Sequence, residues 1–248
     1  MISWNSFRRT VAAQALAAVF FALLPASAAS GQALSVVPVN IFLSPGQKAT
    51  SLTVTNQGTS ETAIQIRAFD WSQKNGEDQL TASKDVVLSP PLTRIAPGAS
   101  QVVRLILRQT PEYHEATYRI LLDQIPPPAE PGVVHMVLRL SIPIFARPTI
   151  RAFPDVQFHV ERDGKQLYLV ATNAGILHEA IRDIVLTAPD GRKLKPESGA
   201  SPYILAGSTR RWRIAAQDSV PLTSETLQLT TKADAGAIDQ QVRIAAAK

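Results

Sequence analysis

The sequence predicts an all-β protein made of two β-sandwiches. Short apolar segments alternate with polar residues along most of the chain, and turn signals such as Asn75-Gly76 separate them. No segment combines a sustained 3.6-residue apolar period with recognisable helix caps. Many short strands with turns between them are typical of a sandwich rather than of a parallel sheet covered by helices.

The first half of the chain has seven expected strands. Turn-forming residues end them, for example Asn56-Gln57-Gly58 and Pro126-Pro127-Pro128. In chain order the expected strands cover residues 34–43, 49–55, 63–71, 86–88, 101–108, 117–125 and 133–146.

A second set of strands follows a proline-containing segment at residues 145–150. The expected strands there are residues 167–172, 180–187, 203–205, 209–215, 226–230 and 241–245. We therefore expect an N-terminal domain over residues 30–148 and a C-terminal β-sandwich over residues 149–248.

Residues 1–29 have the features of a secretory signal. Arg8 and Arg9 form a basic start, residues 11–24 are apolar apart from Gln14, and residues 26–28 are small enough for cleavage. A retained anchor is the alternative, and the arginine pair leaves open the twin-arginine route of export. No later segment approaches the eighteen apolar residues of a membrane span, so the mature protein is expected to be soluble.

Composition argues against several kinds of function. The chain has no cysteine, which excludes thiol nucleophiles and thiolate metal sites. Its net charge of +5 is dispersed and lacks interleaved aromatic residues, so nucleic-acid binding is not expected.

No catalytic or metal-binding motif is found either. The four histidines have no metal-site spacing, and we expect no catalytic residue, metal or cofactor. These histidines are His114, His135, His159 and His178.

One apolar row is longer than an ordinary strand needs. It runs through alternate positions from Val134 to Ile144 and would lie on one face of a strand. Two interpretations are open at this point. The row belongs to a long core strand, or it belongs to a strand whose apolar face is partly offered to another protein.

Several blocks resemble the periplasmic chaperones of the chaperone–usher pilus pathway. They occur in the family's order across nearly the whole first domain. Trp71 and Gln73, with the Asn75-Gly76 turn, resemble the archaic branch of the family, which is associated with spore-coat-U-like pilins. The blocks that carry the wider resemblance are residues 52–56, 89–105, 115–127 and 144–148.

The resemblance implies two immunoglobulin-like sandwiches set at an angle and a non-enzymatic function in the periplasm. Such a chaperone lends its seventh strand to a pilin subunit that lacks its last strand, and delivers the subunit to an outer-membrane usher. It also implies a possible self-capping homodimer. The donor residues implied by the alignment are Val134, Met136, Leu138, Leu140 and Ile142.

Two charged features of the family are compared with this chain. Asn40 and Pro143 stand where the family has an arginine and a lysine that hold the pilin's terminal carboxylate, so Asn40, Arg104 and Arg139 are the candidates for this anchor. The resemblance also implies a salt bridge between the domains, made by Glu115, Arg147 and Asp218.

Two other classes of function stay open. A secreted adhesin or carbohydrate-binding module would need exposed aromatic side chains, for which Trp71 and Trp212 are the candidates. A secreted hydrolase would need a cluster of acid, base and nucleophile that the sequence does not indicate.

Overall fold

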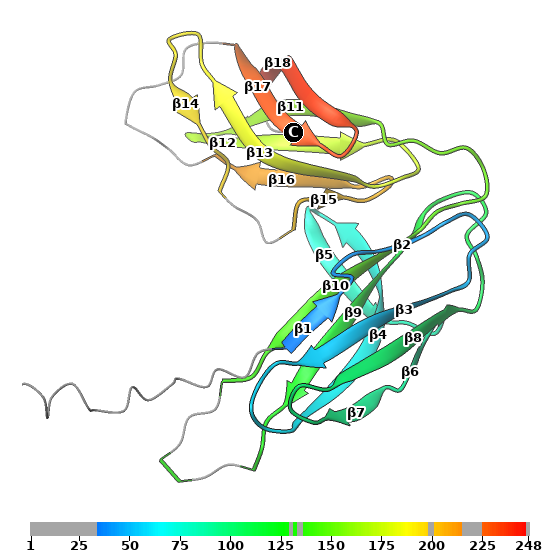
Figure 1. Cartoon of the computed structure of the whole chain (residues 1–248). Coiled ribbons are helices and arrows are strands. Elements are labelled where there is room, and N and C mark those ends of the chain that lie inside the picture. The colour runs from blue at the N-terminus through cyan, green and yellow to red at the C-terminus, as the bar shows by residue number, and fades with distance from the viewer. Residues whose placement is uncertain (1–33, 129–130, 133–135, 198–200, 215–224, 247–248) are drawn as a thin grey trace, which may run out of the picture.

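The computed structural model describes residues 34–128, 131–132, 136–197, 201–214 and 225–246. These residues form eighteen strands, β1 to β18, and no helix. Consequently, they contain no helix long and apolar enough to cross a membrane. Figure 1 shows two sandwiches that meet at an angle. The predicted all-β fold class is therefore confirmed.

The first domain consists of two sheets. One has the order β1 (Leu34–Val37), β3 (Ala49–Asn56), β8 (Ser100–Leu107) and β6 (Val86–Ser89). The other has the order β2 (Ile41–Leu43), β10 (Arg139–Ala146), β9 (Ala116–Ile125), β4 (Thr62–Lys74) and β5 (Glu77–Ala82), with β7 (Leu92–Ile95) also beside β4.

Alternating apolar residues of both sheets fill the space between them. Leu105 of β8 faces Ile64, Ile120 and Ile144 of the second sheet, and all four belong to one fully buried cluster. Each such side chain stabilises the fold by about 1.5–3 kcal/mol on burial. The period-two pattern of the sequence thus specifies the core of this domain.

The first expected strand is divided between the two sheets. β1 pairs with β3, whereas β2 pairs in parallel with β10, and Pro38 lies between them. Proline cannot donate a main-chain hydrogen bond to a sheet, so it suits this crossing point. The crossing brings β2 beside the strand that carries the long apolar row.

The second domain folds around its own core. Its strands follow the order β14, β13, β17, β18, β11, β12 and β16, and β15 pairs with β13. β18 (Gly236–Ala246) joins the two halves, because it pairs first with β17 and then in parallel with β11. The remaining bounds are β11 Val156–Asp163, β12 Gln166–Asn173, β13 Glu179–Thr187, β14 Lys193–Leu194, β15 Tyr203–Ile204, β16 Thr209–Arg213 and β17 Thr226–Ala233.

The structure corrects several predicted elements. β5, β7, β11 and β14 were not expected from the sequence. β5 has no alternating pattern because all six of its residues are exposed. The strand expected over residues 133–146 begins only at Arg139, residues 136–138 are not in a strand, and residues 133–135 lie outside the described residues.

Candidate functional site

The apolar row on β10 divides at Leu140. Ile142 and Ile144 are 3% and 0% exposed and belong to the core of the first domain. The predicted donor role of Ile142 is therefore wrong, because its side chain already fills this core. Leu140 is half-buried and packs against the edge of the same core.

The residues before β10 are exposed instead. Met136 is 92% exposed and Leu138 is 37% exposed, while Val134 lies outside the described residues. The main chain at Leu138 is nevertheless held in place. The backbone N–H of Gln124 donates to the Leu138 carbonyl at 2.9 Å, and the Leu138 N–H donates to Gln124 Oε1 at 3.3 Å. The exposed side chain of Leu138 is thus presented from a backbone that is held by hydrogen bonds.

The edge of β10 that faces β2 is paired over a short stretch only. β2 pairs with Ile144, Phe145 and Ala146, whereas β9 pairs with all of β10 on the opposite side. Among the described strands, none pairs with residues 139–143 on the β2 side. Main-chain hydrogen-bonding groups at such an edge are available to another strand.

Neither arginine proposed as a carboxylate anchor lies in the cleft between the domains. Arg139 donates to Asp123, which also accepts from Arg67 at 2.6 Å. Burial opposes ionisation of Asp123, but the hydrogen bonds from Arg139 and Arg67 outweigh it and lower its pKa. Arg104 is exposed on β8, in the other sheet. Both predictions are corrected for this reason.

Asn40 does lie at the boundary between the domains. The hydroxyl of Tyr203, from β15 of the second domain, donates to Asn40 Oδ1 at 3.2 Å. Pro143 of β10 lies opposite Arg119 of β9. A cation therefore stands one strand away from the position where the resemblance led us to expect one.

Arg119 is the functional candidate that sequence reasoning missed. Its side chain is 12% exposed, its guanidinium lies 3.7 Å from the centre of the Trp71 ring, and it donates to Ser201 Oγ at 3.2 Å. Burial is the main reason why the pKa of Arg119 is lowered, although nearby Asp78 opposes this effect. The sequence could have indicated Arg119 only through its position opposite Pro143, and that position is known only once β9 is paired with β10.

Two arginines share one acid beside this position. Asp78 lies 3.0 Å from Arg210 and 3.6 Å from Arg119. Arg210 also donates to the Ser201 carbonyl at 3.0 Å. This group of Arg119, Arg210 and Asp78 therefore carries one excess positive charge at a partly buried position between the domains, where electrostatic attraction to an anion is stronger than in water.

The expected salt bridge between the domains has a different composition. Glu115 Oε2 accepts from His178 Nδ1 at 2.7 Å and from the His178 backbone N–H at 2.9 Å. Arg147 is exposed and forms no salt bridge with any described residue, and Asp218 lies outside them. Glu115 does join the domains as predicted, but its partner is a histidine, and the predicted pairing with Arg147 is wrong.

A buried aromatic cluster lies beneath this contact. Trp71 and Phe145 of the first domain pack against Tyr203 of the second, together with Ala180 and Leu205. Trp71 is only 3% exposed, and Trp212 is 7% exposed in the core of the second domain. Neither tryptophan can therefore serve as the exposed sugar-binding platform that an adhesin would need.

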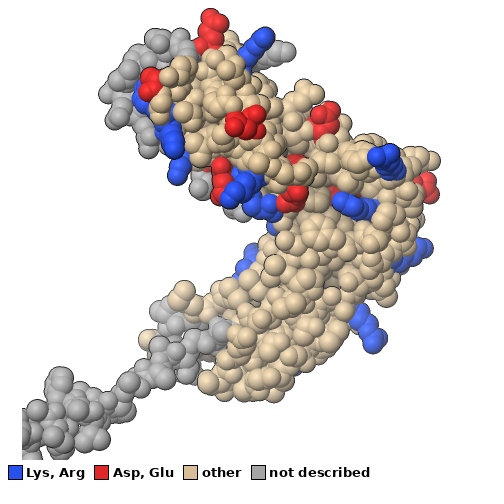
Figure 2. Space-filling model, turned by 45° about the horizontal axis from the view of Figure 1, so that its top comes forward, with Lys and Arg blue, Asp and Glu red and all other residues tan. Residues whose placement is uncertain are grey.

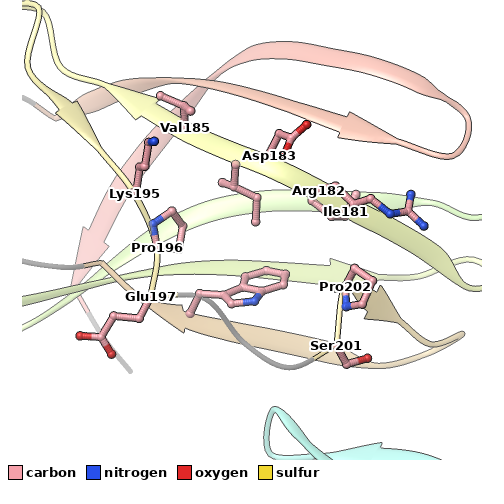
Figure 3. Close-up of a pocket in the computed structure, with 11 residues that line it drawn as sticks. Ile181, Arg182, Asp183, Val185, Lys195, Pro196, Glu197, Ser201 and Pro202 are labelled. Carbon is pink, nitrogen blue, oxygen red and sulfur yellow. The ribbon is translucent and has the colours of Figure 1, made fainter. Parts of the chain in front are cut away.

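The second domain contains a separate hollow of about 400 Å³. Figure 3 shows it between β13 and the segment that carries Pro196, with Lys195 and Glu197 at its rim. Charges of both signs line it, so it has no marked preference for an ion. Among the residues that the structure describes, no group of three His, Cys, Asp or Glu side chains is placed to hold a metal.

Charged side chains of both signs are also mixed on the face shown in Figure 2. They gather mainly over the second domain and the junction, and the visible surface of the first domain is largely uncharged. The mixing of both signs agrees with the sequence, whereas their concentration over one part of this face was not expected from it.

Comparison with known proteins relates the first domain to a family. Residues 33–151 match the pili and flagellar-assembly chaperones, specifically their PapD N-terminal domain. The first domain is therefore similar to the N-terminal domain of pilus-assembly chaperones. The matched region contains both sheets of the first domain, β10 and Arg119.

Two curated relatives are similar to part of the chain. The chain is 26% identical to the chaperone protein FimB/FhaD of Bordetella pertussis over 57% of its length and 61% of that protein. It is 25% identical to the chaperone protein PapD of Escherichia coli over 52% of its length and 56% of that protein. The aligned regions thus span less than two thirds of these two relatives.

Similar folds extend over both domains. The structure resembles a chain of the CsuC–CsuE chaperone–tip adhesion subunit complex of archaic Csu pili from Acinetobacter baumannii. The TM-score is 0.63 at 20% identity, over 87% of this chain and 100% of that one. It also resembles the chaperone YadV, with a TM-score of 0.60 at 16% identity over 85% and 98% of the two chains. These similarities support the two-domain immunoglobulin-like fold.

Proposed function

We propose that this chain is a periplasmic chaperone that binds a pilin subunit by donor-strand complementation and delivers it to an outer-membrane usher. The open edge of β10 beside an exposed apolar segment is the observation that carries the proposal. A client strand can pair with this edge while apolar side chains enter pockets of the client. The similarity of the first domain to pilus-assembly chaperones supports the same conclusion.

The donor residues are proposed to be Met136, Leu138 and Leu140, with Val134 as a further candidate from the sequence. Each side chain can contribute about 1.5–3 kcal/mol when a client buries it. Rigid-body and ordering entropy reduce the net free energy of binding. Methionine adapts to pockets of different shape, so Met136 suits a chaperone that accepts more than one client.

We propose Arg119 as the cation that receives the client's terminal carboxylate. It lies opposite Pro143, at the closed end of the open β10 edge, and the group formed with Arg210 and Asp78 has an excess positive charge. A guanidinium can bind a carboxylate through two parallel hydrogen bonds. Asn40 would border this site through its contact with Tyr203.

The remaining features follow from the same proposal. Residues 1–29 would direct export and be removed, and the domains would span residues 30–148 and 149–248. Binding and release need no enzymatic activity, because tighter packing of the subunit in the fibre supplies the free energy.

Without a client, a second copy would cover the open edge and form a self-capping homodimer. Membership of the archaic branch is proposed from Trp71, Gln73 and the Asn75-Gly76 turn.

Co-expression with a candidate pilin subunit from the same genome, followed by affinity purification, tests the function. The native chain should co-purify with a soluble pilin, and Leu138→Glu should abolish capture without unfolding the chaperone. Leu92→Glu is the matched control, because Leu92 is exposed on β7, away from the proposed site. A pilin that is stable and soluble without any complex would contradict the proposal.

A further inference from the structure

The end of β4 and the whole of β5 form a hairpin that reaches the second domain, and β5 adds little to the core of its own domain. All six residues of β5 are exposed, and β5 pairs only with β4. Figure 1 shows the hairpin extending toward β15 and β16. An edge strand of this kind is a liability unless it has another role. Its contacts with the second domain indicate what that role is.

Gln73 forms a two-point contact across the junction. Its side-chain amide donates to the Tyr203 carbonyl at 2.9 Å, and its Oε1 accepts from the Leu205 N–H at 3.0 Å. The same amide donates to Asp78 Oδ1 at 2.9 Å. All three hydrogen bonds are satisfied at once, so the amide fixes residues 203–205 against the hairpin.

Asp78 joins the hairpin to both cleft arginines. Arg210 of the second domain donates to it at 3.0 Å, and Arg119 of the first domain lies 3.6 Å away. The hairpin passes below Ser201 in Figure 3, and Ser201 accepts from Arg119 through its hydroxyl and from Arg210 through its carbonyl. Loss of Asp78 would leave two partly buried cations facing each other.

The tip of the hairpin also lies close to the second domain. Asn75 and Gly76 have positive φ values of 54° and 81°, which the tight turn requires. A Cβ added at Gly76 would lie 3.6 Å from the backbone nitrogen of Arg211. The turn therefore approaches β16 at ordinary contact distance.

The connection between the domains does not by itself fix their angle. β10 ends at Ala146, β11 begins at Val156, and the chain passes between the domains through this one segment. Domains joined in this way move relative to each other unless their interface prevents it. The hairpin adds a further side-chain connection beside the Glu115–His178 contact and the aromatic cluster.

We propose that Gln73 and Asp78 are positioning residues that hold the second domain at the angle required for client binding. Through them the hairpin places Tyr203 beside Asn40 and keeps Arg119 and Arg210 in one group. The binding role rests on the proposed chaperone function, whereas the effect on domain angle does not depend on it.

The absence of cysteine in the native chain makes this proposal directly measurable. Spin labels at Thr59→Cys and Gln240→Cys, two exposed positions in different domains, report the distribution of distances between the domains. In this background Gln73→Ala should broaden or shift the distribution. Gln79→Ala is the matched control, because Gln79 is an exposed glutamine of the same hairpin and forms no side-chain hydrogen bond with a described residue of the second domain.

Capture of the co-expressed pilin is the second measurement. Gln73→Ala should weaken it about tenfold, a loss of about 1.4 kcal/mol, and Asp78→Asn should weaken it in the same direction. Leu138→Glu should abolish capture but leave the distance distribution unchanged. An unchanged distribution for Gln73→Ala would overturn the proposal, as would a broadened distribution with native capture. If the native chain captures no pilin, the chaperone function fails, while the distances still decide the effect on domain angle.

Discussion

His178 of the second domain stacks on Phe145 of β10, with ring centroids 3.5 Å apart and an angle of 11° between the rings. The strand that carries the open edge therefore ends inside the interface between the domains. Glu115 also holds His178 in place, through hydrogen bonds at Nδ1 and at the backbone N–H. The open edge of β10 and the junction between the domains therefore share a contact at Phe145.

Phe145→Ala should destabilise the protein by about 3–5 kcal/mol, because Phe145 is fully buried against Trp71, Tyr203 and His178. Chemical denaturation measures the free energy of unfolding. Phe145→Leu, which retains most of the buried volume, should cost less. A loss below about 1 kcal/mol for the alanine variant would contradict the packing described here.

Glu115→Ala should cost about 1–3 kcal/mol, because it leaves the buried N–H groups of His178 without their acceptor. Glu115→Gln retains an acceptor oxygen and should cost less. The control is Glu112→Ala, which removes an exposed carboxylate from the same segment. Equal stabilities of the Glu112 and Glu115 alanine variants, measured by thermal unfolding, would show that this contact contributes nothing.

Arg119→Ala should weaken pilin capture more than tenfold if Arg119 receives the terminal carboxylate. The difference in capture between the native chaperone and Arg119→Ala should disappear when the pilin carries extra residues after its native C-terminus. The terminal carboxylate is then missing from the position that Arg119 would contact. Arg119→Lys should bind with intermediate strength, since it retains the charge but not the planar guanidinium. Arg94→Ala, an exposed arginine on β7, serves as the control. An equal defect with native and extended pilins would argue for a structural role only.

Asp123 should make the free energy of unfolding depend on pH in the acidic range. Its pKa is lower in the folded protein, where Arg139 and Arg67 hydrogen-bond to the carboxylate. The stabilisation is therefore fully present above the unfolded-state pKa of about 3.9 and is lost as the pH falls through the lower folded-state value. Asp123→Asn should lose less stability between neutral pH and pH of about 3, measured by urea unfolding. If the free energy of unfolding falls equally with pH in the native chain and in Asp123→Asn, the proposed link between Asp123 and stability is wrong.

The sequence allowed the core to be predicted well and the cleft poorly, for physical reasons. The alternation of β3, β8 and β9 is a local property that sets which residues face inward. Arg119, in contrast, becomes a candidate only when β9 pairs with β10 and the second domain covers Trp71. Glu115 was correctly placed at the junction, but its partner His178 depends on how the domains meet.

The apolar row shows the same limit within a single strand. Period-two alternation from Val134 to Ile144 is equally compatible with a core strand and a donated strand. The structure divides the row, because Ile142 and Ile144 have core partners and Met136 has none among the described residues. No sequence pattern marks Leu140 as the point of division.

The three-residue length of β2 has a consequence for the client. An incoming strand that follows the open edge of β10 from Arg139 meets β2 at Ile144, so within β10 only residues 139–143 are available to it. At roughly 3.3 Å per residue, this is a run of about 17 Å. A client chain that continued further would collide with β2, so the edge favours a polypeptide that ends there. In the proposed complex, β2 therefore stops the client strand at Ile144 and favours the end of a client chain over an internal segment.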